Sequence, residues 1–167
     1  VSVALKERQR YAIDVLVARY GYPVNGAAGL VGNLTAESGV LPSRIEGSSS
    51  ATPMRAKNFA GKVTDFTAEE IINRSSAAER GPKLPGVGLA QWTSKGRRDG
   101  LFKHSYQGRT AGAPILKDMD AQLDYLVKEL KESYKGVNKI LTNPGVTVND
   151  ACDEVVYRFE VPGSVVG

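Results

Sequence analysis

The chain has 167 residues, the length of a typical single domain. Because 41% of the residues are hydrophobic and 24% are charged, the chain can bury a core, and disorder of the whole chain is excluded. No stretch approaches the roughly 18 consecutive apolar residues of a membrane helix, and the first residues lack a signal-peptide pattern, so we expect no membrane insertion. The one cysteine and the one histidine exclude a disulfide framework and a multi-Cys or multi-His metal site, so we expect no metal and no cofactor.

The net charge of +4 comes from 22 Lys and Arg against 18 Asp and Glu. A nucleic-acid-binding domain usually gathers its basic residues in a patch with interleaved aromatic residues. Here the basic residues are scattered, and only residues 95–98 form a short cluster, which we interpret as a solvated helix start. We therefore expect no nucleic-acid partner, and we rank helical DNA binding behind the catalytic and wall-binding functions considered below.

The first two predicted elements are helices. Apolar residues spaced on one face predict a helix over residues 4–20, which Gly21 stops. Asn25 is a candidate N-cap for a second helix, from Gly26 to about Glu37. Small residues are frequent in that helix, and glycine inside a helix costs about 0.5–1 kcal/mol relative to alanine. The second helix is therefore expected to be central and buried against its neighbours.

The middle of the chain is predicted to be less regular. Residues 39–66 lose helical periodicity and are rich in Gly, Pro and Ser, so we expect a long loop or a small β lobe there. Thr67 and Glu70 form a capping box that opens a helix to about Arg80. A second Gly- and Pro-rich stretch follows, and then a helix is predicted from Ser94 to His104.

The C-terminal third is predicted to hold three helices. The clearest runs from Lys117 to Tyr134 with a continuous apolar stripe, and a short one lies around Val137–Leu141. Thr147 caps a final helix from Val148 to about Glu160, with Pro162 as its stop. The whole chain is therefore expected to be mainly α, with about six to seven helices.

Glu37 is the most informative candidate for catalysis, because it stands at the predicted C-terminal end of the glycine-rich helix. Partial burial and the negative end of the helix dipole would both raise the pKa of a carboxyl at this place. A raised pKa is what a general acid needs in order to stay protonated near neutral pH. The alternative is an ordinary solvated glutamate in a last helical turn.

Four segments carry a resemblance to the phage tail lysozyme family of the lysozyme superfamily, in family order and over most of the chain. They are Gly29–Ser38 (Gly-Leu-Val-Gly-Asn-Leu-Thr-Ala-Glu-Ser), Gly88–Thr93 (Gly-Leu-Ala-Gln-Trp-Thr), Met119-Asp120-x-Gln122-Leu123 and Phe159-Glu160-x-Pro162. The resemblance implies a lysozyme-like fold with a single catalytic domain over residues 1–167. It also implies a glycoside hydrolase, a muramidase that cleaves the β-1,4 bond between N-acetylmuramic acid and N-acetylglucosamine in peptidoglycan.

On this resemblance Glu37 protonates the departing glycosidic oxygen, and Ser38 belongs to the same motif near the substrate. Gln91 lies with Gly88 on a turn, where its amide can bond sugar groups. Trp92 either stacks on a sugar or packs in the core.

Two residues near the C-terminus complete this group of expectations. Tyr157 either lines the cleft or packs in the core. Glu160, in the late motif, is expected to be a structural brace near the site, with direct catalysis as the alternative.

The second carboxylate is open. Glycosidases usually use a pair about 5–5.5 Å apart when retaining and about 6.5–9.5 Å apart when inverting. Glu46 is the nearest loop candidate and Asp65 a more distant one, with a plain surface charge as the alternative for each. His104 has no acidic partner nearby in its helical stretch, so we expect it to be structural or solvated.

Two other activities remain open. A lytic transglycosylase would form 1,6-anhydro products and needs no activated water, and a non-catalytic wall-binding virion module would bind glycan strands without cleaving them. The resemblance places the protein in a phage tail or particle, acting on the cell wall or in the periplasm, with other virion proteins as partners. It also indicates a fragment or a processed domain of a larger virion protein.

Overall fold

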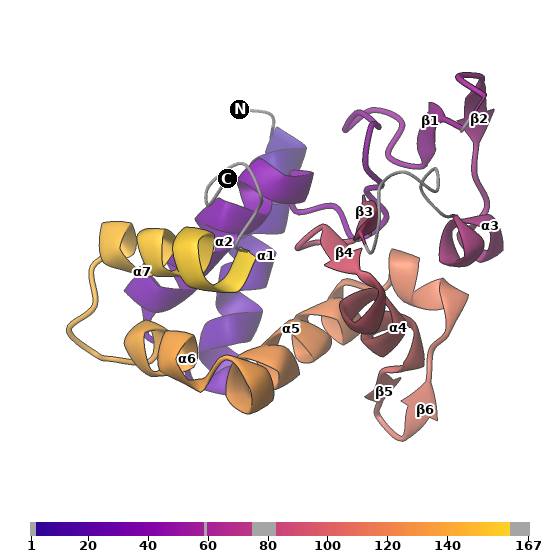
Figure 1. Cartoon of the computed structure of the whole chain (residues 1–167). Helices are drawn as coiled ribbons and strands as arrows, with labels where there is room; N and C mark the ends of the chain where they lie inside the picture. Colours follow the sequence, from indigo (N-terminus) through magenta and orange to yellow (C-terminus); the bar gives the residue numbers. More distant parts are fainter. Residues whose placement is uncertain (1–2, 59, 75–82, 161–167) are drawn as a thin grey trace. The chain divides into compact units, whose positions relative to one another are not determined.

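The computed structural model describes residues 3–58, 60–74 and 83–160. The chain divides into two compact units, and each is described by itself (Figure 1). Unit 1 takes the chain up to Val40 and again from Leu126 onward, and unit 2 takes Leu41–Tyr125. The prediction of a mainly α protein with small β elements is confirmed, because helices hold most of the described residues.

Unit 1 is helical. Its elements are α1 (Val3–Tyr20), α2 (Val24–Ser38), the part of α5 (Met119–Ser133) from Leu126 on, α6 (Lys135–Leu141), α7 (Val148–Glu154) and the π-helix η3 (Val155–Glu160). Helix α2 contacts α1, α6, α7 and η3, so the prediction of a central buried helix is confirmed (Figure 1). A Cβ on Gly29 would lie 2.8 Å from the backbone nitrogen of Cys152, which shows how closely α2 approaches α7.

One helix start in unit 1 differs from the predicted one, and another agrees with it. Helix α2 begins at Val24 with Pro23 as its N-cap, so the prediction of Asn25 as the cap is wrong. The Asn25 side chain instead donates from Nδ2 to the carbonyl oxygen of Val146 at 3.0 Å, a long-range contact that no local pattern reveals. Thr147 does cap the last helix, because its Oγ1 accepts the N–H of Asp150.

The last helix is not a single α-helix. It changes at Val155 into the π-helix η3, in which Val155 and Phe159 are buried. The Phe159 ring meets the ring of Tyr134 edge-on, with centroids 4.8 Å apart. Pro162, the predicted stop, lies outside the described residues.

Unit 2 combines three antiparallel strand pairs with short helices. The strands are β1 (Arg55–Lys57) with β2 (Val63–Asp65), β3 (Lys83–Val87) with β4 (Trp92–Ser94), and β5 (Ser105–Tyr106) with β6 (Arg109–Thr110). The helices are α3 (Ala68–Asn73), α4 (Lys95–Lys103), the 3-10 helix η2 (Ala113–Lys117) and α5 up to Tyr125. The first strand pair confirms the small β lobe predicted within 39–66, whereas the other two were not predicted.

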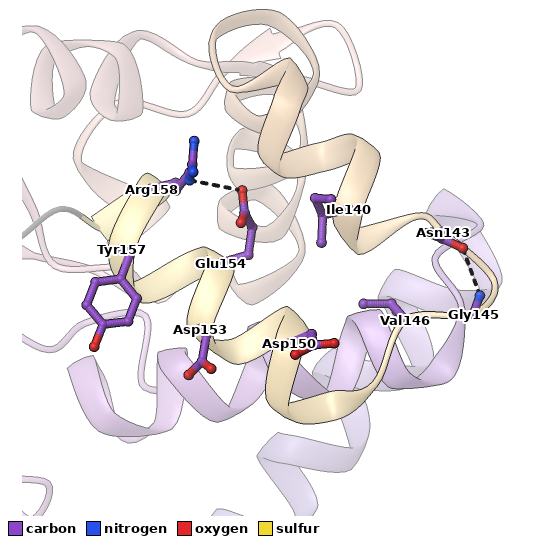
Figure 2. Close-up of a pocket in the computed structure, with 9 residues that line it drawn as sticks. All are labelled: Ile140, Asn143, Gly145, Val146, Asp150, Asp153, Glu154, Tyr157 and Arg158. Atoms are coloured by element: carbon purple, nitrogen blue, oxygen red, sulfur yellow. Dashed lines mark hydrogen bonds and ion pairs between the residues drawn. The ribbon is translucent and has the colours of Figure 1, made fainter.

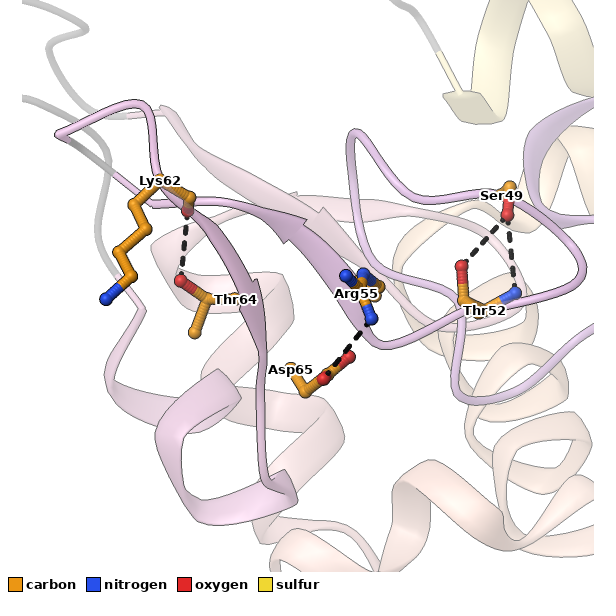
Figure 3. A network of polar contacts seen from close by, with 6 residues as sticks. All are labelled: Ser49, Thr52, Arg55, Lys62, Thr64 and Asp65. Carbon is orange, nitrogen blue, oxygen red and sulfur yellow. Dashed lines mark hydrogen bonds and ion pairs between the residues drawn. The ribbon is translucent and has the colours of Figure 1, made fainter.

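The β1–β2 hairpin is held by polar contacts that Figure 3 shows. Arg55 and Asp65 face each other in the register of the two strands, and their side chains form an ion pair with an N–O distance of 3.5 Å. Both side chains are largely exposed, so this pair stabilises the hairpin only weakly. Asp65 is therefore engaged with Arg55, which favours the interpretation of its carboxylate as surface charge.

Helix caps in unit 2 follow their sequence signals, but the length of α3 (Ala68–Asn73) does not. Both hydrogen bonds of the capping box between Thr67 and Glu70 are present. Helix α3 ends at Asn73, because Arg74 is extended, so the helix does not continue unbroken as predicted, and residues 75–80 lie outside the described residues. Ser94 is the N-cap of α4, since its Oγ accepts the N–H of Arg97.

Candidate active site

Glu37 lies in the last turn of α2, as the sequence predicted. Gly39 ends the helix in the left-handed region with a φ of 65°, and its N–H bonds to the carbonyl oxygen of Thr35. Arg8 of α1 donates from both Nε and Nη2 to the carbonyl oxygen of Gly39, each at 3.1 Å. A cation at a helix C-terminus meets its negative end, so α1 fixes the segment that carries Glu37.

The Glu37 side chain is half-buried, and burial raises the pKa of its carboxyl above the ordinary value of 4.5. Burial disfavours the charged form because the carboxylate loses hydration. This is the direction that a general acid requires. The geometry therefore allows Glu37 to hold a proton at a higher pH than an exposed glutamate does.

Ser38 does not face solvent. It is fully buried, and its hydroxyl donates to the carbonyl oxygen of Leu34 at 3.1 Å, one turn back in α2. The structure therefore gives no support to the expectation that Ser38 binds substrate. The hydroxyl instead adds a side-chain hydrogen bond to the Leu34 carbonyl, which the backbone N–H of Val40 also approaches.

Asn33 stands one helical turn before Glu37, on the same side of α2. It is only 4% exposed, and no group of the described chain donates to its buried Oδ1. A buried polar atom without a partner costs free energy, so packing and hydrogen bonding within the described chain do not account for an asparagine at this position. In the sequence, Asn33 stands out only by its place in the Gly29–Ser38 motif.

In unit 2, the turn between β3 and β4 carries Gly88 and Gln91. Gly88 has a φ of 85° and Gln91 a φ of 52°, so both occupy the left-handed region. A left-handed backbone is unfavourable for glutamine, and hydrogen bonds of the Gln91 side chain offset this cost. Nε2 of Gln91 donates to the carbonyl oxygens of Arg44 and Gly88, each at 2.8 Å. The Nε2 donors of Gln91 thus hold this turn and are not free to donate to sugar groups, while sugar binding by the rest of the amide stays a prediction.

Gly88 is required by its neighbours as well as by its φ. A Cβ there would lie 2.9 Å from both Oε1 of Gln122 and the Trp92 ring. Trp92 is 1% exposed and meets the ring of Tyr125 at 5.1 Å between centroids. Trp92 therefore packs in the core of unit 2, and the structure gives no support to sugar stacking.

Gln122 stands in one of the four motifs, and the structure shows it as a buried positioning residue, a role that the sequence did not predict. Its Oε1 accepts the N–H of Leu89 at 2.9 Å, and its Nε2 donates to the carbonyl oxygens of Pro42 and Ile115. Gln122 is fully buried, and its three hydrogen bonds tie the turn to two other segments of unit 2. A signal was present, because Gln122 is a polar residue placed three positions after Met119 on the apolar face of α5.

Glu46 lies on a loop attached to β3. Its N–H donates to the carbonyl oxygen of Gly86 at 2.8 Å, and its Oε1 accepts the N–H of Gly86 at 3.2 Å. Ile45 next to it forms a β-bridge with Val87. The structure thus brings Glu46 close to the Gly88–Gln91 turn within unit 2, and the side chain remains exposed.

The two remaining expectations concern η3. Tyr157 is 60% exposed, so the core alternative for it is wrong. Glu160 is half-buried at the last described position of η3, which agrees with a bracing role without testing it. Glu37, Tyr157 and Glu160 belong to unit 1, whereas Glu46 and Gln91 belong to unit 2.

His104 is buried, and its Nε2 lies 2.8 Å from Oδ2 of Asp124. The prediction of a structural histidine is confirmed, and its acidic partner lies outside the helical stretch in which none was expected. The partner stands 20 residues later, on α5, and only the fold brings the two together.

Comparisons with known proteins give one match. A family model described as phage tail lysozyme matches residues 7–165, nearly the whole chain. No match was found among curated proteins or among solved structures. Within the described ranges, no helix is long and apolar enough to cross a membrane, and no group of three potential ligand side chains could hold a metal ion.

Proposed function

Because the chain belongs to the phage tail lysozyme family, and so is a phage lysozyme-type peptidoglycan hydrolase, we propose that it is a muramidase. It cleaves the β-1,4 bond between N-acetylmuramic acid and N-acetylglucosamine as part of a phage tail or particle. The substrate is the glycan strand of the bacterial wall, and the other partners are virion proteins.

The observation that carries this proposal is the half-buried Glu37 at the end of α2, with a pKa raised by burial. In the proposed reaction Glu37 gives its proton to the glycosidic oxygen, so that the departing sugar leaves as an alcohol. Arg8 and Ser38 hold the backbone around Glu37 and do not touch the substrate. A rigid attachment of this kind is useful, because proton transfer requires a group placed within hydrogen-bond reach.

Glu46 is proposed as the second carboxylate. Its exposed side chain stands on a loop that is held to β3 through both backbone and side-chain bonds. As the base of an inverting reaction it would activate a water molecule, and in a retaining reaction it would attack the sugar carbon. Gln91 supports this loop by its bond to the Arg44 carbonyl oxygen.

The test compares wild type with Glu37→Gln on purified peptidoglycan, following turbidity and identifying the released products by mass spectrometry. Removing a general acid lowers the rate by about 10²- to 10⁴-fold. Glu132→Gln is the matched control, because Glu132 is an exposed glutamate of the same unit, and this variant should lyse walls at the wild-type rate.

Undiminished lysis by Glu37→Gln would overturn the assignment of the acid. Products ending in reducing muramic acid support hydrolysis, whereas 1,6-anhydro ends would make the protein a lytic transglycosylase. Binding to sacculi without any released fragment, by wild type itself, would leave a non-catalytic wall-binding module. Glu46→Gln in the same assay tests the second carboxylate separately.

A further inference from the structure

A groove of about 590 Å³ lies in unit 1, lined by α6, the loop after it, α7 and η3 (Figure 2). Of its lining residues, only Tyr157 is also one of the candidate site residues described above. The groove combines acidic, aromatic and aliphatic side chains, and each group offers a different contact.

The acidic side chains outnumber the basic one. Asp150, Asp153 and Glu154 line the groove together with a single cation, Arg158. Arg158 Nε and Glu154 Oε2 form an ion pair at 3.7 Å, which Figure 2 marks with a dashed line. The carboxylates of Asp150 and Asp153 have no ion-pair or hydrogen-bond partner among the described residues, and both side chains are exposed. The groove is therefore locally negative, in a chain whose net charge is +4.

Two apolar groups in the groove are also open to solvent. Tyr157 is 60% exposed and Ile140 is 38% exposed. Single exposed apolar residues are common on protein surfaces, but here both line one hollow with the unpaired carboxylates. In Figure 2, Asp153 and Tyr157 point the same way from the helix, as residues four positions apart on one helix do. An aromatic face, an aliphatic surface and unpaired carboxylates together suit a cation carried on a hydrocarbon chain.

We propose that this groove binds the aliphatic ammonium group of the diamino acid in the peptide stems of peptidoglycan. The inference rests on the proposed function and names a part of the substrate outside the bond that is cleaved. Asp150 and Asp153 attract the ammonium group, while Ile140 and Tyr157 contact its methylene chain. The free amine is a cationic group of the wall polymer, whereas the stem carboxylates and the lactyl carboxylate are anionic and would be repelled here.

The neutral sugar units are a less suitable occupant. A sugar ring could stack on Tyr157, but it would leave the charges of Asp150 and Asp153 without a counterion. Arg158, the group that could attract an anion, is already paired with Glu154. The charge balance of the groove therefore favours the amine over both alternatives.

The test measures binding of two soluble stem peptides to the full chain by calorimetry, one with its diamino-acid amine free and one with that amine acetylated. Wild type is expected to bind the free-amine peptide about 2- to 30-fold more tightly, which corresponds to two exposed charge pairs. The double variant Asp150→Asn, Asp153→Asn should abolish this difference. Asp14→Asn, at an exposed position of α1, is the control and should preserve it.

Equal affinity of wild type for the two peptides, absence of binding, or an undiminished preference in the double variant would each overturn the inference. Failure of the proposed function gives a different result, because it is measured by Glu37→Gln on glycan strands freed of their peptides. The double variant should cleave those bare strands at the wild-type rate. Slower cleavage of bare strands by the double variant, but not by Asp14→Asn, would assign the two aspartates to the glycan instead and would overturn the inference.

Discussion

Replacing Gly29 with alanine should destabilise the protein, whereas the same change at Gly32 should stabilise it. Both glycines lie in α2, three positions apart. At Gly29 a Cβ would meet the backbone of α7, 2.8 Å from both the nitrogen of Cys152 and the carbonyl oxygen of Val148, with the Cβ of Ala151 closer still. At Gly32 a Cβ would meet no atom of the described chain within 4 Å apart from its chain neighbours and the backbone of its own helix.

The two magnitudes follow from these surroundings. Alanine is better than glycine inside a helix by about 0.5–1 kcal/mol, and Gly32→Ala should gain that amount. Overpacking costs about 1–3 kcal/mol, and the upper half of that range applies to Gly29 because backbone atoms cannot rotate away. Gly29→Ala should therefore lose about 1–2.5 kcal/mol net.

Thermal unfolding followed by circular dichroism measures both effects. For a chain of this size, about 2–4 °C of Tm corresponds to 1 kcal/mol. The Tm should fall by about 2–10 °C for Gly29→Ala and rise by about 1–4 °C for Gly32→Ala. An equal rise in both variants would show that α2 and α7 do not approach as described. The backbones of α2 and α7 would then lie too far apart for a Cβ on Gly29 to touch Cys152 or Val148.

Three further predictions concern the candidate site. Burial raises the pKa of Glu37, so the unfolded state ionises first as pH rises, and the native state loses stability from about pH 4.5 until the folded-state pKa is passed. Urea midpoints should show Glu37→Gln as stable as wild type in acid and more stable at neutral pH. A stability difference between the two proteins that narrows as pH rises would contradict this. Trp92, the single tryptophan, is 1% exposed, so its emission maximum should not move when soluble glycan fragments are added, and a shift would mean that it contacts sugar. Gln91→Glu replaces two amide donors by a carboxylate facing the carbonyl oxygens of Arg44 and Gly88. Urea unfolding should show that the free energy of unfolding falls by about 1–3 kcal/mol, whereas wild-type stability would refute the positioning role.

The sequence by itself determined the features that depend on neighbouring residues. The caps at Thr67 and Thr147 are hydrogen bonds across three positions, so their residue types predict them directly. The glycine-rich pattern predicted a buried helix ending beside Glu37, because glycines in a helix are tolerated where a neighbour needs the space. The four motifs indicated the family, since their order along the chain carries the signal.

Only the tertiary structure decided which polar side chains are free to meet a ligand. Ser38 and Gln91 looked available, but their donors are used by carbonyl oxygens that the fold brings within reach. His104 gained an acidic partner from 20 residues away, and Gln122 tied together segments as distant as Pro42. The physical reason is that buried polar groups must be paired, and long-range partners are chosen by packing, which no local pattern specifies.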